Sequence, residues 1–90
     1  MSRTQTPQAE NERLAAYPAA IQQAIRSEAH AWFYDRIGPA IDMYESHRQW
    51  ALILTPEQRR FHKSGAWFAN QNLKSAAIGV VQREMGDPTD

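Results

Sequence analysis

The residues with the clearest potential for recognition chemistry lie in the last third of the chain. On a helix, which advances about 100° per residue, six side chains between positions 60 and 78 share one face: Arg60, Lys63, Trp67, Gln71, Lys74 and Ile78. An indole among cations can anchor a partner protein while the charges steer its approach. The same indole could instead pack against the stems of Lys63 and Lys74, or against another helix. Protein binding is our first hypothesis.

Two further tryptophans, Trp32 and Trp50, add to this apolar surplus. They could form the seam of a homodimer or dock on a different protein, because aromatic side chains dominate many interfaces. The sequence therefore predicts a non-enzymatic interaction or regulatory module that associates with itself and with a protein partner.

The segment 58–83 supports an alternative, because it contains cations but no acidic residue, although the whole chain is neutral. Its candidate contacts to nucleic acid are Arg59, Arg60, Lys63, Trp67, Gln71 and Lys74. A break near Gly65 would give a helix-turn-helix-like arrangement with residues 67–84 as the recognition helix. Few cations share one face and the net charge is zero, so nucleic-acid binding is the second hypothesis.

Side chains suited to catalysis or metal binding are present, but their spacing does not favour either role. His30, His47 and His62 have no His, Asp or Glu three or four residues away, which is the spacing of a helical metal pair. Asp42 and Glu45 share a helix face, which indicates a solvated ion-pair patch. The chain has no cysteine and no glycine-rich phosphate loop. We expect no enzymatic activity, no cofactor and no bound metal.

Length and composition fit one small domain. The chain has 90 residues, of which 42% are hydrophobic, and a chain of this size buries roughly 60–65% of its unfolded surface. The longest apolar run, 50–54, is far shorter than the roughly twenty residues that span a bilayer. The polar amino-terminal stretch lacks the apolar run of a secretion signal. We expect a cytoplasmic location and no membrane partner.

Local sequence signals predict where the helices that carry the candidate residues begin. Thr6-Pro7 and Thr55-Pro56 each put a hydroxyl at an N-cap and a proline at the first helical position. Residues Glu57 and Gln58 then resemble a capping box. Further boundaries fall at Pro18 and at Gly38-Pro39.

These boundaries predict an all-α fold. We expect a compact bundle of three to four helices, at about 7–17, 18–37, 39–54 and 56–84, and homodimerisation could complete it. A break of the last helix at Gly65 stays open, because glycine in a helix interior costs about 1 kcal/mol relative to alanine. The single domain is expected over 7–84, with disordered tails at 1–6 and 85–90.

Apolar spacing predicts the buried faces of these helices. Residues 18–37 carry one stripe at steps of four: Ile21, Ile25, Ala29, Phe33 and Ile37. Residues 39–54 carry two stripes, one with Ile41, Tyr44, Ala51 and Leu52 and one with Met43, Trp50 and Leu54. The core face of 56–84 includes Phe61, Phe68, Leu73, Ala76 and Val80. A helix with two apolar sides is typical of a sandwiched or oligomeric arrangement.

Overall fold

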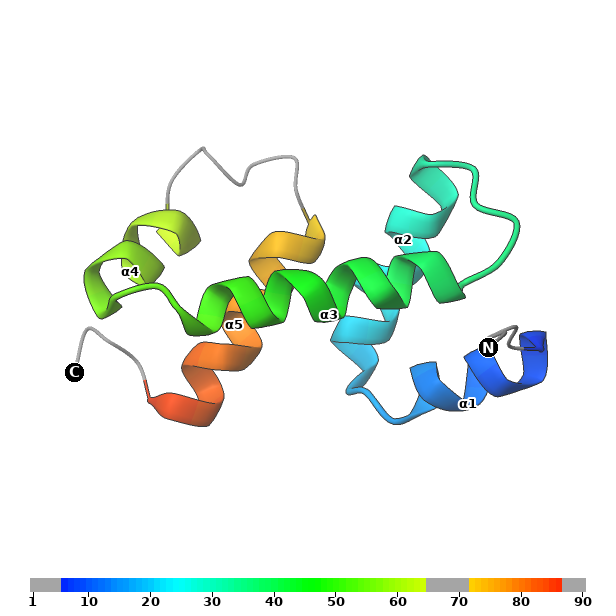
Figure 1. Ribbon diagram of the computed structural model, residues 1–90, viewed down its shortest axis with the longest axis horizontal. Coiled ribbons are helices and arrows are strands. Elements are labelled where there is room, and N and C mark those ends of the chain that lie inside the picture. Colours follow the sequence, from blue (N-terminus) through cyan, green and yellow to red (C-terminus); the bar gives the residue numbers. More distant parts are fainter. Residues whose placement is uncertain (1–5, 65–71, 87–90) are drawn as a thin grey trace. The chain divides into compact units, whose positions relative to one another are not determined.

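The computed structural model describes residues 6–64 and 72–86, and within these residues it contains helices and no strand. The helices are α1 (Pro7–Ala15), α2 (Ala19–Ala31), α3 (Gly38–Leu52), α4 (Pro56–Ser64) and α5 (Asn72–Met85) (Figure 1). The predicted all-α fold is confirmed, and the four predicted helix starts lie within one residue of those observed. Thr6 caps α1 and Met85 ends α5, so these two residues belong to the helical part rather than to the predicted tails.

The helices group into two units whose boundary falls inside α3. Unit 1, Met1–Asp42, contains α1, α2 and the first turn of α3, whereas unit 2, Met43–Asp90, contains the rest of α3 with α4 and α5. The boundary between the units falls within α3, which runs from Gly38 to Leu52. The helix signals of the sequence predict one domain over 7–84 and do not indicate this division.

Each unit has its own buried apolar side chains. In unit 1 these are Leu14, Ile21, Ile25, Ala29, Ala40 and Ile41. In unit 2, Ala51 of α3 packs with Ile78 and Val81 of α5, and the half-buried Trp50 and Leu54 pack against this cluster. The other buried apolar residues of unit 2 are Tyr44, Leu73 and Ala77. The first parts of the predicted stripes on α2 and α3 are therefore confirmed.

Both threonine N-caps predicted from the sequence are present. The Oγ1 atom of Thr6 accepts a hydrogen bond from the N–H of Ala9 at 3.1 Å. At the start of α4, Thr55 Oγ1 accepts from the N–H of Gln58 at 3.1 Å, and Gln58 Oε1 accepts from the N–H of Thr55 at 2.9 Å. This reciprocal pair is a capping box, which satisfies two backbone donors that a helix start otherwise leaves without partners.

Removing the Thr55 hydroxyl should weaken α4. We expect Thr55→Ala to lower the free energy of unfolding by about 1 kcal/mol, because a helix loses its N-cap acceptor. The matched variant Thr55→Ser keeps the acceptor and should stay within a few tenths of a kcal/mol of the parent. Urea denaturation followed by helical circular dichroism measures both, and equal stability of the two variants would contradict the capping role.

The helix α2 ends at Ala31 rather than at residue 37. Phe33 has a φ of +57°, in the left-handed region, so the chain cannot continue as a right-handed helix at that point. Phe33, which the stripe places in the core, is 87% exposed, and Ile37 is only half-buried. The prediction of a buried stripe is therefore wrong beyond Ala29.

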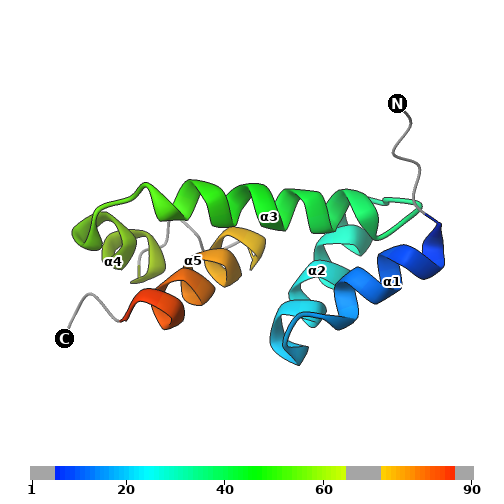
Figure 2. The same ribbon diagram turned by 60° about the horizontal axis from the view of Figure 1, so that its bottom comes forward.

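The segment 56–84, for which the sequence left a break open, is not one continuous helix, because α4 ends at Ser64 and α5 begins at Asn72. The helices α4 and α5 contact each other, as Figures 1 and 2 show, and two parts of one straight helix cannot do so. Phe61, expected on the core face, is 62% exposed on α4. The proposed turn near Gly65 and the predicted core residue Phe68 lie outside the described residues.

The buried face of α5 differs from the predicted one by a rotation of about 100° about the helix axis. Its buried apolar residues are Leu73, Ala77, Ile78 and Val81. The pattern had placed Ala76 and Val80 inside and Ile78 outside. Both faces of this short helix are apolar enough to be buried, so periodicity alone could not select between them.

Candidate functional site

The structure describes the side chains of only part of the predicted binding face. Three of them lie outside the described residues: Trp67, Gln71 and the side chain of Lys63. Arg60 is exposed on α4 and Lys74 is half-buried on α5, whereas Ile78 is fully buried. Ile78 is thus a core residue and not a contact residue, which corrects the sequence prediction.

Two other predicted site residues are engaged within unit 2. Arg59 is 7% exposed, and its Nη1 donates a hydrogen bond to the carbonyl oxygen of Leu54 at 2.9 Å. Trp50 is half-buried, and its ring centroid lies 5.4 Å from that of His62. Arg59 therefore holds the connection between α3 and α4 instead of facing solvent, where a nucleic acid could reach it.

The remaining predicted contact, Trp32, belongs to a turn at the end of α2 that we call the aromatic turn: Trp32, Phe33 and Tyr34. The N–H of Phe33 donates to the carbonyl of His30 at 3.2 Å, and the N–H of Tyr34 donates to that of Ala29 at 3.0 Å. This pair of bonds is the Schellman motif, which ends a helix with one residue in the left-handed conformation. That position usually carries glycine, and here it carries Phe33.

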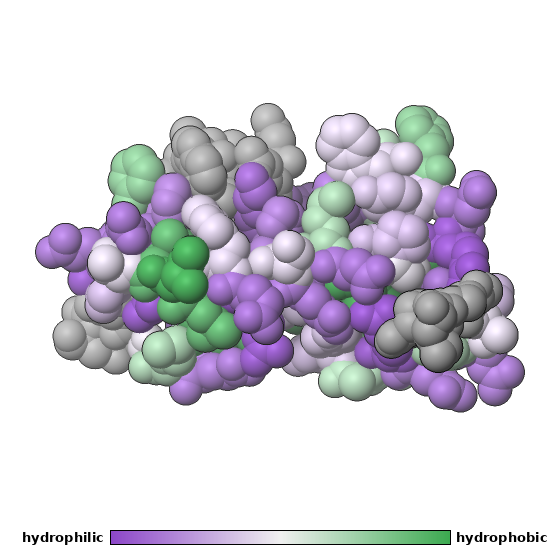
Figure 3. All heavy atoms as spheres, viewed as in Figure 1, coloured by the Kyte–Doolittle hydropathy of each residue, from purple (hydrophilic) through white to green (hydrophobic). Residues whose placement is uncertain are grey.

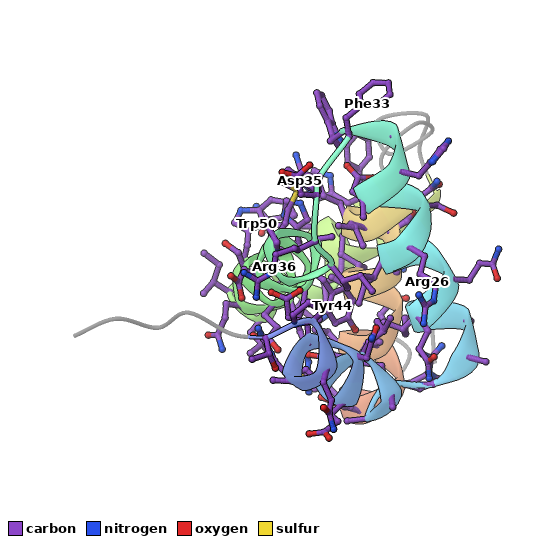
Figure 4. The ribbon with its side chains drawn as sticks, turned by 90° about the vertical axis from the view of Figure 1, so that its right-hand side faces the viewer. Arg26, Phe33, Asp35, Arg36, Tyr44 and Trp50 are labelled. Carbon is purple, nitrogen blue, oxygen red and sulfur yellow. The ribbon has the colours of Figure 1, made fainter. Side chains whose placement is uncertain are left out.

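The first two side chains of the aromatic turn lie in solvent. Trp32 is 63% exposed and Phe33 is 87% exposed. The indole N–H of Trp32 donates to the carboxylate of Glu28, one helical turn earlier, which restricts the orientation of the ring. Figure 4 shows Phe33 at the outer edge of the molecule, with its ring directed away from the helices.

An open pocket of about 450 Å³ lies beside this turn, and all of its lining residues fall between positions 29 and 37. It combines the rings of His30, Phe33 and Tyr34 with the charged side chains of Asp35 and Arg36. A surface with this composition can bury an aromatic group and pair with both signs of charge. It has the mixed character of a protein-binding surface.

The segment after the aromatic turn is anchored to α1 by a buried acid. Glu10 is nearly inaccessible to solvent, and its Oε2 lies 2.6 Å from Nη2 of Arg36. The carboxylate also accepts hydrogen bonds from the backbone of Ile37 and Gly38, at the start of α3. A carboxylate at a helix N-terminus satisfies free N–H groups and complements the helix dipole. We call Glu10, Arg36 and Gly38 the acid clamp.

Glycine is required at position 38 because of the acid clamp. A Cβ atom there would lie 2.5 Å from Oε2 and 2.9 Å from Cδ of Glu10, which is closer than nonbonded atoms approach. The carboxylate could move away only by leaving Arg36 and the two backbone donors. The small residue therefore permits the close approach of α1 to the start of α3.

The acid clamp shifts the ionisation of its members. The Arg36 guanidinium, hydrogen-bonded to Glu10, holds the pKa of that carboxyl below its ordinary value of 4.5; burial opposes this effect, and the Gly38 and Ile37 amides add to it. The same hydrogen bond raises the pKa of Arg36. Glu10 therefore remains ionised in the folded state at any pH where the unfolded chain also has it ionised.

This shift predicts the pH dependence of stability. A carboxyl whose pKa is lower in the folded state adds stability above its unfolded pKa, and this stability is lost as the pH falls through the folded pKa. We expect the stability difference between the parent and Glu10→Gln to be constant above about pH 6 and to shrink below about pH 4.5. Urea denaturation of both proteins across this range measures it. A difference that persists undiminished at about pH 3 would contradict the assignment.

Unit 2 has a separate exposed apolar area at the end of α3. Leu52 and Ile53 are exposed there, although the stripe pattern places Leu52 inside. Figure 3 shows the corresponding hydrophobic surface where α3 ends.

Comparison with known proteins adds no functional assignment, since no family model, curated protein or solved structure matches the chain. Within residues 6–64 and 72–86, no cluster of three or more His, Asp or Glu side chains could hold a metal ion. The helices of the same described ranges are all too short or too polar to cross a bilayer. The exposed rings and the adjoining pocket make the aromatic turn the candidate site.

The sequence pattern indicates Trp32 as a contact residue but indicates neither Phe33 nor the acid clamp. One signal for the turn was available: three consecutive aromatic residues, 32–34, cannot share one helix face when successive positions differ by about 100°. At least one of the rings had to be exposed or the helix had to end. No sequence signal pairs Glu10 with Arg36, because their contact depends on the fold.

Proposed function

We propose that the chain is a small helical interaction module that docks a protein partner through the aromatic turn and performs no chemistry of its own. The observation that carries this proposal is Phe33, a bulky residue that is 87% exposed and has a φ of +57°. A left-handed conformation costs about 1–2 kcal/mol for a residue with a side chain. A ring that is 87% exposed recovers little of this cost in contacts with the described part of the chain, so contact with another molecule would explain why it is there.

The rigidity of the aromatic turn also supports the proposal. The two backbone bonds of the Schellman motif, the bond from Trp32 to Glu28 and the acid clamp all restrain the segment from residue 32 to residue 38. Side chains that are already held in place lose less conformational entropy on binding. Tryptophan is also among the residues that most often dominate the binding energy of an interface.

Nucleic-acid binding, the alternative from the sequence, is less well supported. Among its described cations, Arg59 bonds to the backbone of its own unit and Lys74 is half-buried. Of the candidate cations whose side chains the structure describes, Arg60 is exposed, whereas a useful phosphate footprint needs several cations on one surface. We retain the cytoplasmic location as a prediction from the sequence.

Photo-crosslinking in the cells that produce the protein tests the proposal. Benzoylphenylalanine at position 33 keeps an aromatic ring at the site and should give a protein adduct of one defined mass. The control places the same residue at position 61, because Phe61 is an exposed aromatic of unit 2. Equal adducts from both positions, or none from position 33, would refute docking through the aromatic turn.

A further inference from the structure

We infer that the partner of the aromatic turn is a second copy of the same chain, which inserts its Phe33 into the pocket beside the aromatic turn and receives the other Phe33 in exchange. This inference rests on the proposed function and specifies its partner. The projecting ring and the pocket occur together on the nine-residue segment 29–37. A two-fold axis beside that segment would bring each ring to the opposite pocket, as an isologous dimer requires.

The size of the pocket is adequate for this exchange. Its volume of about 450 Å³ lies within the range of roughly 300–1,000 Å³ that accepts small ligands, and a phenyl ring is smaller than such ligands. In its own chain Phe33 is one of the residues that line the pocket, and its ring is directed away from the helices (Figure 4), so it borders the pocket without filling it. The Phe33 ring of another copy can enter the pocket from outside.

The charges beside the pocket are self-complementary. The lining includes an exposed acid, Asp35, together with His30 and the partly exposed Arg36. Two-fold symmetry can place the acid of each copy against a basic group of the other, so the contact needs no foreign counterion. Unit 1 as a whole has four arginines and five acids over residues 1–42, a net charge of −1. Two copies would therefore repel each other only weakly.

The area available predicts a weak dimer. Aromatic side chains bury roughly 150–250 Å² each, so four rings, two from each copy, would bury about 600–1,000 Å² before the pocket walls are added. Specific interfaces begin near 1,200 Å² in total. We therefore expect a dissociation constant of about 1–100 µM, because an interface at the lower limit of size gains little beyond the entropy cost of association.

Sedimentation equilibrium of the purified full chain, from about 5 to 500 µM, tests the inference around the expected dissociation constant. The parent should shift from monomer to dimer, and both Phe33→Gly and Trp32→Ala should raise the dissociation constant at least tenfold. The matched control Ile53→Ser removes an exposed apolar side chain from unit 2 and should leave the dimer unchanged. Circular dichroism confirms that each variant remains helical.

A parent that stays monomeric, or a dimer that Phe33→Gly leaves intact, would overturn the inference. The crosslinking experiment separates this failure from failure of the proposed function. A monomeric chain whose position 33 crosslinks to a different protein would overturn self-association and preserve docking through the aromatic turn. A monomeric chain that gives no adduct from position 33 would refute both self-association and docking through the aromatic turn.

Discussion

Replacing Glu10 with alanine is expected to lower the free energy of unfolding by about 2–4 kcal/mol, the largest change we predict for any single side chain. The substitution leaves the Arg36 guanidinium without its carboxylate and removes the acceptor of the Ile37 and Gly38 amides. Urea denaturation followed by circular dichroism measures the loss. The control Glu12→Ala removes an exposed acid from the same helix and should change the free energy by less than about 0.5 kcal/mol.

A double-mutant cycle with Gly38 tests the geometry of the acid clamp. Gly38→Ala alone should destabilise by about 1–3 kcal/mol, because its Cβ would displace the carboxylate of Glu10. In the Glu10→Ala background there is no carboxylate to displace, so the same substitution should have little effect. Additive losses would contradict the contact, since residues that touch are expected to couple by about 0.5–3 kcal/mol.

The second large effect has the opposite sign. Phe33→Gly should raise the free energy of unfolding by about 1 kcal/mol, because glycine adopts the left-handed conformation without steric strain. The gain is reduced by the greater freedom of glycine in the unfolded chain. Thermal and urea denaturation both measure the change. In a domain of this size, 1 kcal/mol corresponds to a shift of about 4–8 °C in Tm.

The variant Phe33→Ala separates backbone strain from loss of the ring. Alanine keeps the left-handed strain and removes the exposed ring, so its stability should remain within about 0.5 kcal/mol of the parent. If alanine and glycine stabilise equally, the backbone at position 33 is not the source of the effect. If both destabilise, the Phe33 ring packs within the protein, and its exposure would not explain its presence.

The helix starts could be predicted from the sequence because their signals are local. Thr6 and Thr55 form their N-cap bonds with residues three positions further along the chain, and such bonds need no information about the tertiary fold. The buried part of the α2 stripe, from Ile21 to Ala29, was also predictable, because its period of four is uninterrupted. These two kinds of local pattern were sufficient to identify the all-α class.

The end of α2 was not predictable in the same way. A Schellman motif is usually signalled by glycine, but Phe33 occupies its left-handed position, so the hydrophobic pattern favoured a longer helix. The acid clamp depends on the contact of Glu10 with Arg36, which are 26 positions apart in the sequence. The spacing of residues along the chain does not predict this contact. The candidate site was therefore found through tertiary structure, although Trp32 had been proposed as a contact residue.

The burial of Arg59 shows a related limit of charge patterns. The acid-free segment 58–83 favoured a basic surface, but a long cationic side chain can turn back to bond a backbone carbonyl of its own chain. Arg59 does this with Leu54. The direction of the Arg59 side chain depends on the connection between α3 and α4, which provides the carbonyl oxygen of Leu54. A count of cations along the sequence therefore overestimated the basic surface that α4 presents.

The most direct test of our account is the crosslinking yield from benzoylphenylalanine at position 30, compared in the parent and in Phe33→Gly. His30 is exposed and lines the pocket beside the aromatic turn, so this probe reports on an occupant without replacing Phe33. We predict a protein adduct when Phe33 is present and at least a tenfold loss when position 33 is glycine, in a variant that is no less stable than the parent. An equal yield from the two proteins would contradict the claim that Phe33 holds a protein partner at this site.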